Sequence, residues 1–141
     1  MYLASQFVTL DAMQAMHVLV VEDEPNNREI AVISLASAGY RVTACANGAE
    51  AVERCAADRY DVVLMDLAMP VMNGLEATRR LRATPGTCDA LIMAVSGCTE
   101  PHERQSGLEA GCDLFLAKPY RRKTLLNLLA EALGRRALAG T

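Results

Sequence analysis

Short apolar runs alternate with longer amphipathic segments through most of the chain. Five runs indicate strands, at residues 17–21, 41–45, 62–65, 90–95 and 113–117. Most are continuously apolar and end at charged or turn-forming residues, which is typical of strands covered on both faces. The segments between and after them indicate helices, at residues 25–38, 47–57, 75–82, 101–110 and 123–133.

Five strand–helix units in alternation predict an α/β domain with a doubly wound, five-stranded parallel sheet. Parallel strands need crossover connections, and the crossover helices then cover both faces of the sheet. In such sheets, ligands bind at the carboxyl ends of the strands. We therefore expect the chemistry of this protein to come from the residues that end or directly follow each strand.

Composition narrows the possible functions. The chain has 141 residues, of which 52% are hydrophobic and 22% charged, the balance of one folded globular domain. Its net charge of -3 creates no basic field to hold nucleic acid, so we expect no direct nucleic-acid binding. No apolar run is long enough to cross a membrane, and the first residues lack a signal-peptide pattern. We expect a cytoplasmic protein without membrane contact.

The two ends and the cysteines suggest no further chemistry. Residues 1–16 place apolar side chains at helical spacing, so they form either an extra helix or an N-terminal arm. The main domain is predicted at residues 17–134, with a C-terminal tail at 135–141. Five cysteines include no CxxC pair, and no histidine is spaced for a zinc site, so we expect free core thiols.

Polar residues at the strand ends form a candidate site. Glu22 and Asp23 follow the first strand, Asp66 ends the third, Ser96 the fourth, and Lys118 follows the fifth. Carboxylates brought together at one edge repel each other unless a cation neutralises them, and Mg²⁺ prefers such oxygen ligands. An ammonium and a hydroxyl nearby suit phosphoryl oxygens. This combination predicts phosphoryl transfer with Asp66 as the nucleophile.

Four motifs carry a resemblance to a known family. VVEDEP, DVVLMDLAMPVMNG, the AVSG around Ser96 and the LAKPY around Lys118 resemble, in order and spacing, the receiver domain of bacterial two-component response regulators. The resemblance covers about His17 to Leu133. The segment GLEATRRLR, which follows the central motif, is similar to the corresponding segment of receivers attached to hybrid histidine kinases.

The resemblance implies a fold and a metal site. The fold is the flavodoxin-like (βα)5 receiver with strand order 2-1-3-4-5. Asp66 would accept a phosphoryl group from a histidine kinase or a histidine phosphotransfer protein. Mg²⁺ would be held by Asp23, Asp66 and the backbone carbonyl of Ala68, while Glu22 would act through metal-bound water.

The resemblance also implies a switch. Ser96 matches the switch hydroxyl, Phe115 the switch aromatic and Lys118 the invariant lysine. Phosphorylation would draw Ser96 inward and change the surface formed by the fourth helix, fifth strand and last helix, which binds a downstream protein or a second copy in a homodimer. The chain would be a signalling switch and not an enzyme, since it catalyses only its own phosphoryl transfer and dephosphorylation.

Departures from the family pattern matter for the switch. Phe115 stands where many relatives have tyrosine, so it offers no phenolic hydrogen bond and is equally well explained as core packing. Ala68 and Cys98 occupy positions that tune access of hydrolytic water in the family, and neither has a charged or amide group to orient that water. We therefore expect slow loss of the phosphoryl group.

Other functions stay open on sequence alone. An enzyme of the haloacid-dehalogenase type also uses an Asp nucleophile and Mg²⁺, but it expects a second Asp where this chain has Ala68. A pseudo-receiver would use the same fold as an interaction module without phosphorylation, and absence of Mg²⁺ binding would favour it. The receiver either acts alone through partner proteins or belongs to a larger hybrid kinase.

Overall fold

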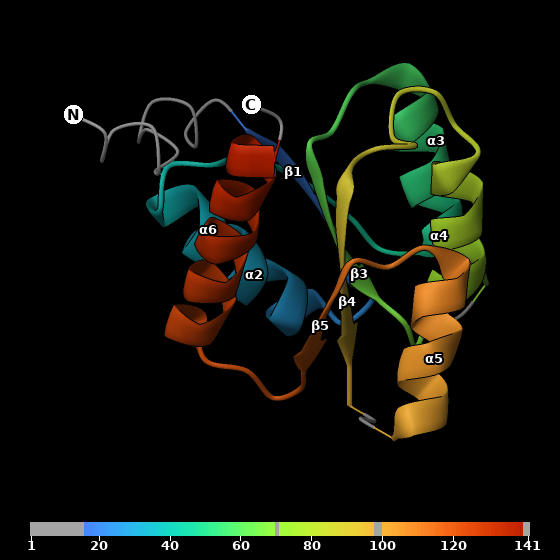
Figure 1. The fold of residues 1–141 in the computed structure, drawn as a ribbon. Coiled ribbons are helices and arrows are strands. Elements are labelled where there is room, and N and C mark those ends of the chain that lie inside the picture. The colour runs from blue at the N-terminus through green and yellow to red at the C-terminus, as the bar shows by residue number, and fades with distance from the viewer. Residues whose placement is uncertain (1–15, 70, 98–99, 140–141) are drawn as a thin grey trace.

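A computed structural model describes residues 16–69, 71–97 and 100–139. A central sheet lies between two layers of helices, with α2 and α6 on one face and α3, α4 and α5 on the other (Figure 1). The expected N-terminal arm, apart from Met16, and the position of Cys98 lie outside the described residues. The predicted three-layer α/β architecture is confirmed.

The five strands are parallel and run in the order β2-β1-β3-β4-β5. Their bounds are β1 His17–Val21, β2 Arg41–Cys45, β3 Val62–Asp66, β4 Leu91–Ser96 and β5 Leu114–Ala117. Asp66 pairs in register with Val95, and Ser96 with Ala117. The carboxyl ends of the central strands therefore meet at one edge of the sheet, as the sequence pattern requires.

Alternate residues of each strand enter separate cores. Leu19 and Met65 pack with residues of α3 and α4, whereas Val20 and Leu64 pack with residues of α2 and α6. Because side chains on a strand point alternately to the two faces, a sheet covered on both faces buries every position. This burial is the physical reason for the continuous apolar runs.

The helices begin close to the predicted residues. Their bounds are α2 Pro25–Ser37, α3 Gly48–Ala57, α4 Gly74–Arg82, α5 Pro101–Ala110 and α6 Arg122–Ala139. The Asn47 side chain accepts a hydrogen bond from the Glu50 amide at 2.9 Å, while the Glu50 carboxylate accepts one from the Ala46 amide, also at 2.9 Å. The second bond reaches one residue further back than in the usual capping box.

The last helix is longer than predicted. The pattern placed its end near residue 133, before a glycine, but α6 continues to Ala139, so residues 135–139 of the expected tail are helical. Arg135 pairs with Glu131 one turn earlier at 3.1 Å, and Arg136 donates to the Asp89 carbonyl at 2.5 Å. These contacts extend the helix past Gly134. Across the described stretches, no helix has both the length and the apolar character to span a bilayer.

The described cysteines are free thiols with a packing role. Cys45, Cys55 and Cys112 are buried, whereas Cys88 is exposed. Burial raises the pKa of Cys45 to about 11 and that of Cys55 to about 12, so neither forms a reactive thiolate near neutral pH. The prediction that cysteines fill the core is confirmed for these three.

Candidate functional site

Three carboxylates meet at the carboxyl edge of the sheet. Glu22 and Asp23 directly follow β1, and Asp66 is the last residue of β3. One carboxylate oxygen of each lies within 4.8 Å of the others. Glu22 is 7% exposed and Asp66 3%, whereas Asp23 is open to solvent. The acidic cluster predicted from the strand ends is therefore assembled, with one side reachable from solution.

Lys118 joins this cluster from the end of β5. Its Nζ lies 2.8 Å from Oε1 of Glu22 and 3.2 Å from Oδ2 of Asp66. Burial lowers the pKa of the Lys118 ammonium, but hydrogen bonds and charge interactions with both carboxylates outweigh this effect, so the pKa is raised. The lysine therefore stays positively charged beside the buried aspartate.

The protein alone disfavours the charged form of the Asp66 carboxyl. Burial is the main cause that raises its pKa to about 6, and Glu22 adds to the rise. The Ala68 amide, which donates to Oδ1 at 3.1 Å, and Lys118 act in the opposite direction. A set of hard oxygen donors whose negative charges repel each other fits Mg²⁺. That the Ala68 carbonyl also binds the metal stays a prediction.

Two glycines let the loop after β3 lie close to its neighbours, which are Asp66 and the start of α3. A Cβ on Gly74 would lie 2.3 Å from the Asp66 carbonyl oxygen, and one on Gly48 would lie 2.6 Å from the Met72 carbonyl oxygen. The Gly74 amide donates to the Leu67 carbonyl at 3.1 Å and closes the loop. The sequence pattern identified Gly74 as a turn-former but gave no reason to single out Gly48, because its contact, Met72, lies in a loop that is distant in the sequence.

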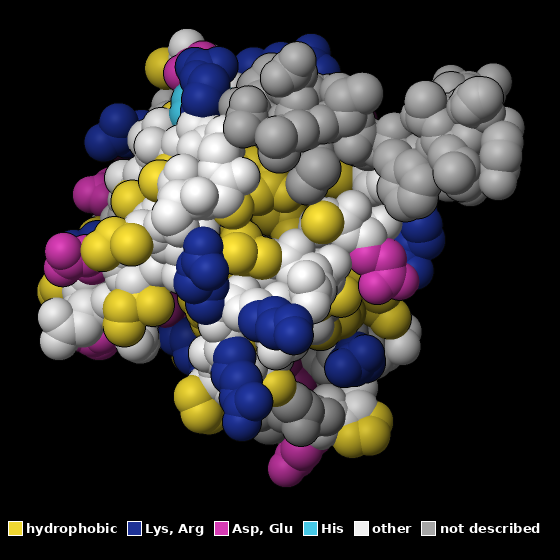
Figure 2. Space-filling model, turned by 90° about the vertical axis from the view of Figure 1, so that its left-hand side faces the viewer, with side chains coloured by type: hydrophobic (Ala, Val, Ile, Leu, Met, Phe, Trp, Pro, Cys, Tyr) yellow, Lys and Arg dark blue, Asp and Glu magenta, His cyan; other side chains and the backbone are white. Residues whose placement is uncertain are grey.

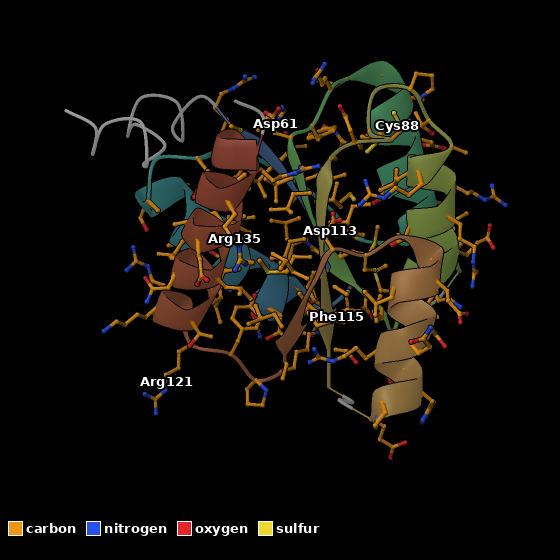
Figure 3. The ribbon with its side chains drawn as sticks, viewed as in Figure 1. Asp61, Cys88, Asp113, Phe115, Arg121 and Arg135 are labelled. Carbon is orange, nitrogen blue, oxygen red and sulfur yellow. The ribbon has the colours of Figure 1, made fainter. Side chains whose placement is uncertain are left out.

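The two predicted switch residues contact α5. The Ser96 hydroxyl hydrogen-bonds to a carboxylate oxygen of Glu103. Phe115 lies half-buried between β5 and α5, and the Arg104 guanidinium lies 5.0 Å from the centre of its ring (Figure 3). A Cβ on Gly107 would meet this ring at 2.5 Å. Sequence reasoning missed Glu103 and Arg104, because a polar helix on the surface gives no local sign of which side chains face the sheet.

Arg28 supports the acidic loop from α2, and it too was missed. Its guanidinium donates to the carbonyls of Glu22 at 3.0 Å and Asp23 at 3.4 Å. Oε2 of Glu22 accepts a hydrogen bond from the Glu24 amide at 3.2 Å. These bonds hold the backbone of the loop while the carboxylates converge. Arg28 lies in the first turns of α2, where an arginine is also common as a solvent-exposed side chain, so the sequence alone gives no signal.

The family follows from a direct comparison. The family model described as "Response regulator receiver domain" matches residues 18–130. The chain belongs to this family. Receivers of this kind are the phosphoacceptor domains of two-component response regulators, so the predicted family and fold are confirmed.

Relatives of this receiver come from several bacteria. Response regulator MprA of Mycobacterium ulcerans is 37% identical over 124 residues, which cover 88% of this chain and 53% of that protein. The MprA proteins of Mycobacterium avium and Mycobacterium bovis are covered to a similar extent, so the chain spans about half the length of these curated relatives.

Solved receiver structures share the fold. Chemotaxis protein CheY4 of Vibrio cholerae superposes with a TM-score of 0.80 at 34% identity, covering 83% of this chain and 98% of that chain. The receiver domain of sensor histidine kinase PA1611 from Pseudomonas aeruginosa, solved with a magnesium ion in its active-site cleft, gives 0.79 at 38%, covering 85% and 98%. Kinase-attached receivers and response regulators are thus similarly related to this receiver, and its kinship with hybrid kinases stays a prediction.

Proposed function

We propose that this receiver accepts a phosphoryl group on Asp66 from a phosphohistidine protein in the presence of Mg²⁺ and thereby switches a protein-interaction surface. One observation carries the proposal: Asp66 is buried with its Oδ2 3.2 Å from the Lys118 ammonium, and its carboxylate lies beside those of Glu22 and Asp23. Such an arrangement is unfavourable for an isolated aspartate and favourable for one that binds a cation and a phosphoryl group.

The residues divide the work of phosphoryl transfer. A carboxylate oxygen of Asp66 attacks phosphorus, the phosphorus–nitrogen bond of the phosphohistidine breaks, and the imidazole nitrogen keeps the electron pair. The Lys118 ammonium holds a phosphoryl oxygen, and the Ala68 amide holds the acceptor carboxylate in place. When bound, Mg²⁺ neutralises charge on the transferring group. Asp23 and Glu22 provide its acidic surroundings.

An apolar strip next to the site fits a protein donor. Ile30 and Ile33 of α2 are 57% and 58% exposed, one helical turn apart, and we call them the α2 strip. A hollow of about 460 Å³ connects Ile30 of this strip with Lys118 at the acceptor edge. It is lined by Asn27, Ile30, Lys118, Pro119 and Tyr120.

Basic residues border this surface. Directly after Tyr120, which lines the hollow, the chain has three exposed basic residues, Arg121, Arg122 and Lys123. Lys and Arg side chains are also spread over the face formed by α2 and α6 (Figure 2). Figure 3 places Arg121 at the end of the molecule where the strands end. The occupant that we propose is the phosphohistidine protein, docked by an apolar face with an acidic rim, because its histidine must reach Asp66 across this edge.

The first test is the intact mass of the protein after incubation with Mg²⁺ and acetyl phosphate. The wild type should gain one phosphoryl group, about 80 Da, in an adduct that is labile to base, as expected for a phosphorylated carboxylate. Asp66→Asn should gain nothing. Lys118→Ala should be phosphorylated much more slowly, because it removes a positive charge from the transferring group.

Each outcome separates the possible functions. A mass gain that persists in Asp66→Asn would place the phosphoryl group elsewhere and contradict the proposal. No gain and no Mg²⁺ binding would identify a pseudo-receiver. No gain despite Mg²⁺ binding would require the same assay with phosphohistidine proteins as donors, and failure there would also contradict the proposal.

A further inference from the structure

The backbone around Ser96 is held on both sides by neighbouring strands. The Leu67 amide donates to the Val95 carbonyl at 3.0 Å, and the Lys118 amide donates to the Ser96 carbonyl at 2.8 Å. The end of β4 is thus fixed between the segment that carries Asp66 and the segment that carries Lys118. Any movement of the Ser96 hydroxyl must therefore come mainly from rotation of its own side chain.

The hydroxyl of Ser96 has one proton to donate. In the structure it bonds to the Glu103 carboxylate. A phosphoryl group on Asp66 would offer a second anionic acceptor at the same strand edge, and a carboxylate and a phosphoryl oxygen both form strong, charge-assisted hydrogen bonds. A single hydroxyl proton cannot serve both acceptors. Formation of the bond to the phosphoryl group thus requires loss of the bond to Glu103.

The helix that carries Glu103 also contacts the other switch residue. Glu103, Gly107 and Ala110 share one face of α5, because they are four and three residues apart. Of the residues of α5, only Gly107 and Ala110 are buried, and the ring of Phe115 occupies the space that a Cβ on Gly107 would need. With such small buried side chains, α5 has few large apolar contacts, and the bond from Ser96 to Glu103 is a polar link between this helix and the end of β4.

We propose that Glu103 is a positioning residue that holds the Ser96 hydroxyl on α5 and so opposes completion of the phosphorylated state. Its carboxylate competes with the phosphoryl group for the hydroxyl proton, and it couples occupancy of Asp66 to release of α5. This inference rests on the proposed phosphorylation of Asp66. It adds a residue that sets the equilibrium between the Ser96 hydroxyl bonded to Glu103 and the hydroxyl bonded to the phosphoryl group.

The test measures an equilibrium and not a rate. Beryllofluoride, whose beryllium becomes tetrahedral when it binds a carboxylate oxygen and so imitates a phosphoryl group there, is titrated in the presence of Mg²⁺, and bound fluoride is quantified by ¹⁹F NMR. Glu103→Gln should lower the dissociation constant by about three- to tenfold, because a neutral amide oxygen accepts a weaker hydrogen bond than a carboxylate. Glu103→Ala, which removes the acceptor, should lower it at least as much.

Two controls separate positioning from other effects of Glu103. In the Ser96→Ala background, Glu103→Gln should leave the dissociation constant unchanged within about twofold, because the competition needs the hydroxyl. Glu109→Gln removes the same charge from an exposed site on α5, where the carboxylate accepts from Gln105 at 3.2 Å, and should also have no effect. Circular dichroism checks that each variant is folded.

The outcomes are distinct. An equal gain in affinity in the wild-type and Ser96→Ala backgrounds would show an effect of charge or helix stability alone and would overturn the inference. So would unchanged affinity in Glu103→Gln and Glu103→Ala. If the wild type binds no beryllofluoride and gains no phosphoryl mass from acetyl phosphate or from a phosphohistidine protein, the proposed function itself fails, and the inference fails with it.

Discussion

At the scale of single residues, Asp66 makes the stability of the protein depend on pH. Burial, and then Glu22, raise its pKa to about 6 from an ordinary value of 3.8. The folded protein therefore binds this proton more tightly than the unfolded chain does. The stabilisation from this proton is complete below about pH 4 and is lost as the pH rises through about 6.

The Asp66→Asn variant tests this effect, because its side chain is neutral at every pH. Without metal, it should be more stable than the wild type at pH 7 by about 1–3 kcal/mol, and the difference should close toward about pH 4. Urea unfolding in EDTA, from about pH 4 to pH 7, measures the difference in unfolding free energy between the variant and the wild type. Glu53→Gln, which changes an exposed carboxyl of α3, should show no such trend. A stability difference independent of pH would contradict the prediction.

At the scale of elements, Arg82 joins the end of α4 to the starts of two strands. Its guanidinium donates to the Gly111 carbonyl at 2.7 and 2.9 Å, to the Ala90 carbonyl at 2.7 Å and to the Asp113 carboxylate at 2.7 Å. Asp113 also accepts from the Ile92 amide at 2.8 Å. One side chain thus satisfies backbone groups from segments that are far apart in sequence.

Arg82→Lys should destabilise the protein by about 1–3 kcal/mol, because an ammonium cannot reproduce the planar fork of donors and leaves half-buried carbonyls without partners. Equilibrium urea unfolding measures the loss. Arg80→Lys on the same helix is the matched control, since Arg80 makes an exposed pair with Glu76 at 3.1 Å and should change stability by less than about 0.5 kcal/mol. Equal losses in the two variants would refute the role of Arg82.

The sequence predicted the strands well but not the contacts that α5 makes with them. Strands and strand-end residues such as Asp66 and Lys118 were predictable, because burial on both faces and parallel pairing leave a local pattern. The bond between Ser96 and Glu103 and the network of Arg82 were not, because they depend on the angle at which a helix lies on the sheet. The end of α6 was misplaced for the same reason: contacts with distant residues extend it past Gly134.

At the scale of the whole molecule, the acceptor edge and the α2 strip form one continuous approach for a protein donor. The strip adjoins the hollow at Lys118, whereas Leu108, another exposed apolar residue at 51%, belongs to α5 on the opposite face of the sheet (Figure 1). A small phosphodonor needs only the acceptor edge, but a phosphohistidine protein must also cover the strip. The two kinds of donor should therefore respond differently to the same substitution.

The test uses a histidine phosphotransfer protein that phosphorylates the wild type. Ile33→Asp should lower the rate of phosphoryl transfer from this donor by about tenfold or more, because it places a charge in the centre of an apolar contact. Phosphorylation by acetyl phosphate should stay unchanged, since Ile33 does not line the hollow at Lys118. Leu108→Asp makes the same change on the other face and should leave both reactions as they are. Transfer rates come from loss of label from the donor over time. If Ile33→Asp slowed both donors equally, the defect would lie in the acceptor site, and the α2 strip would not be the docking surface.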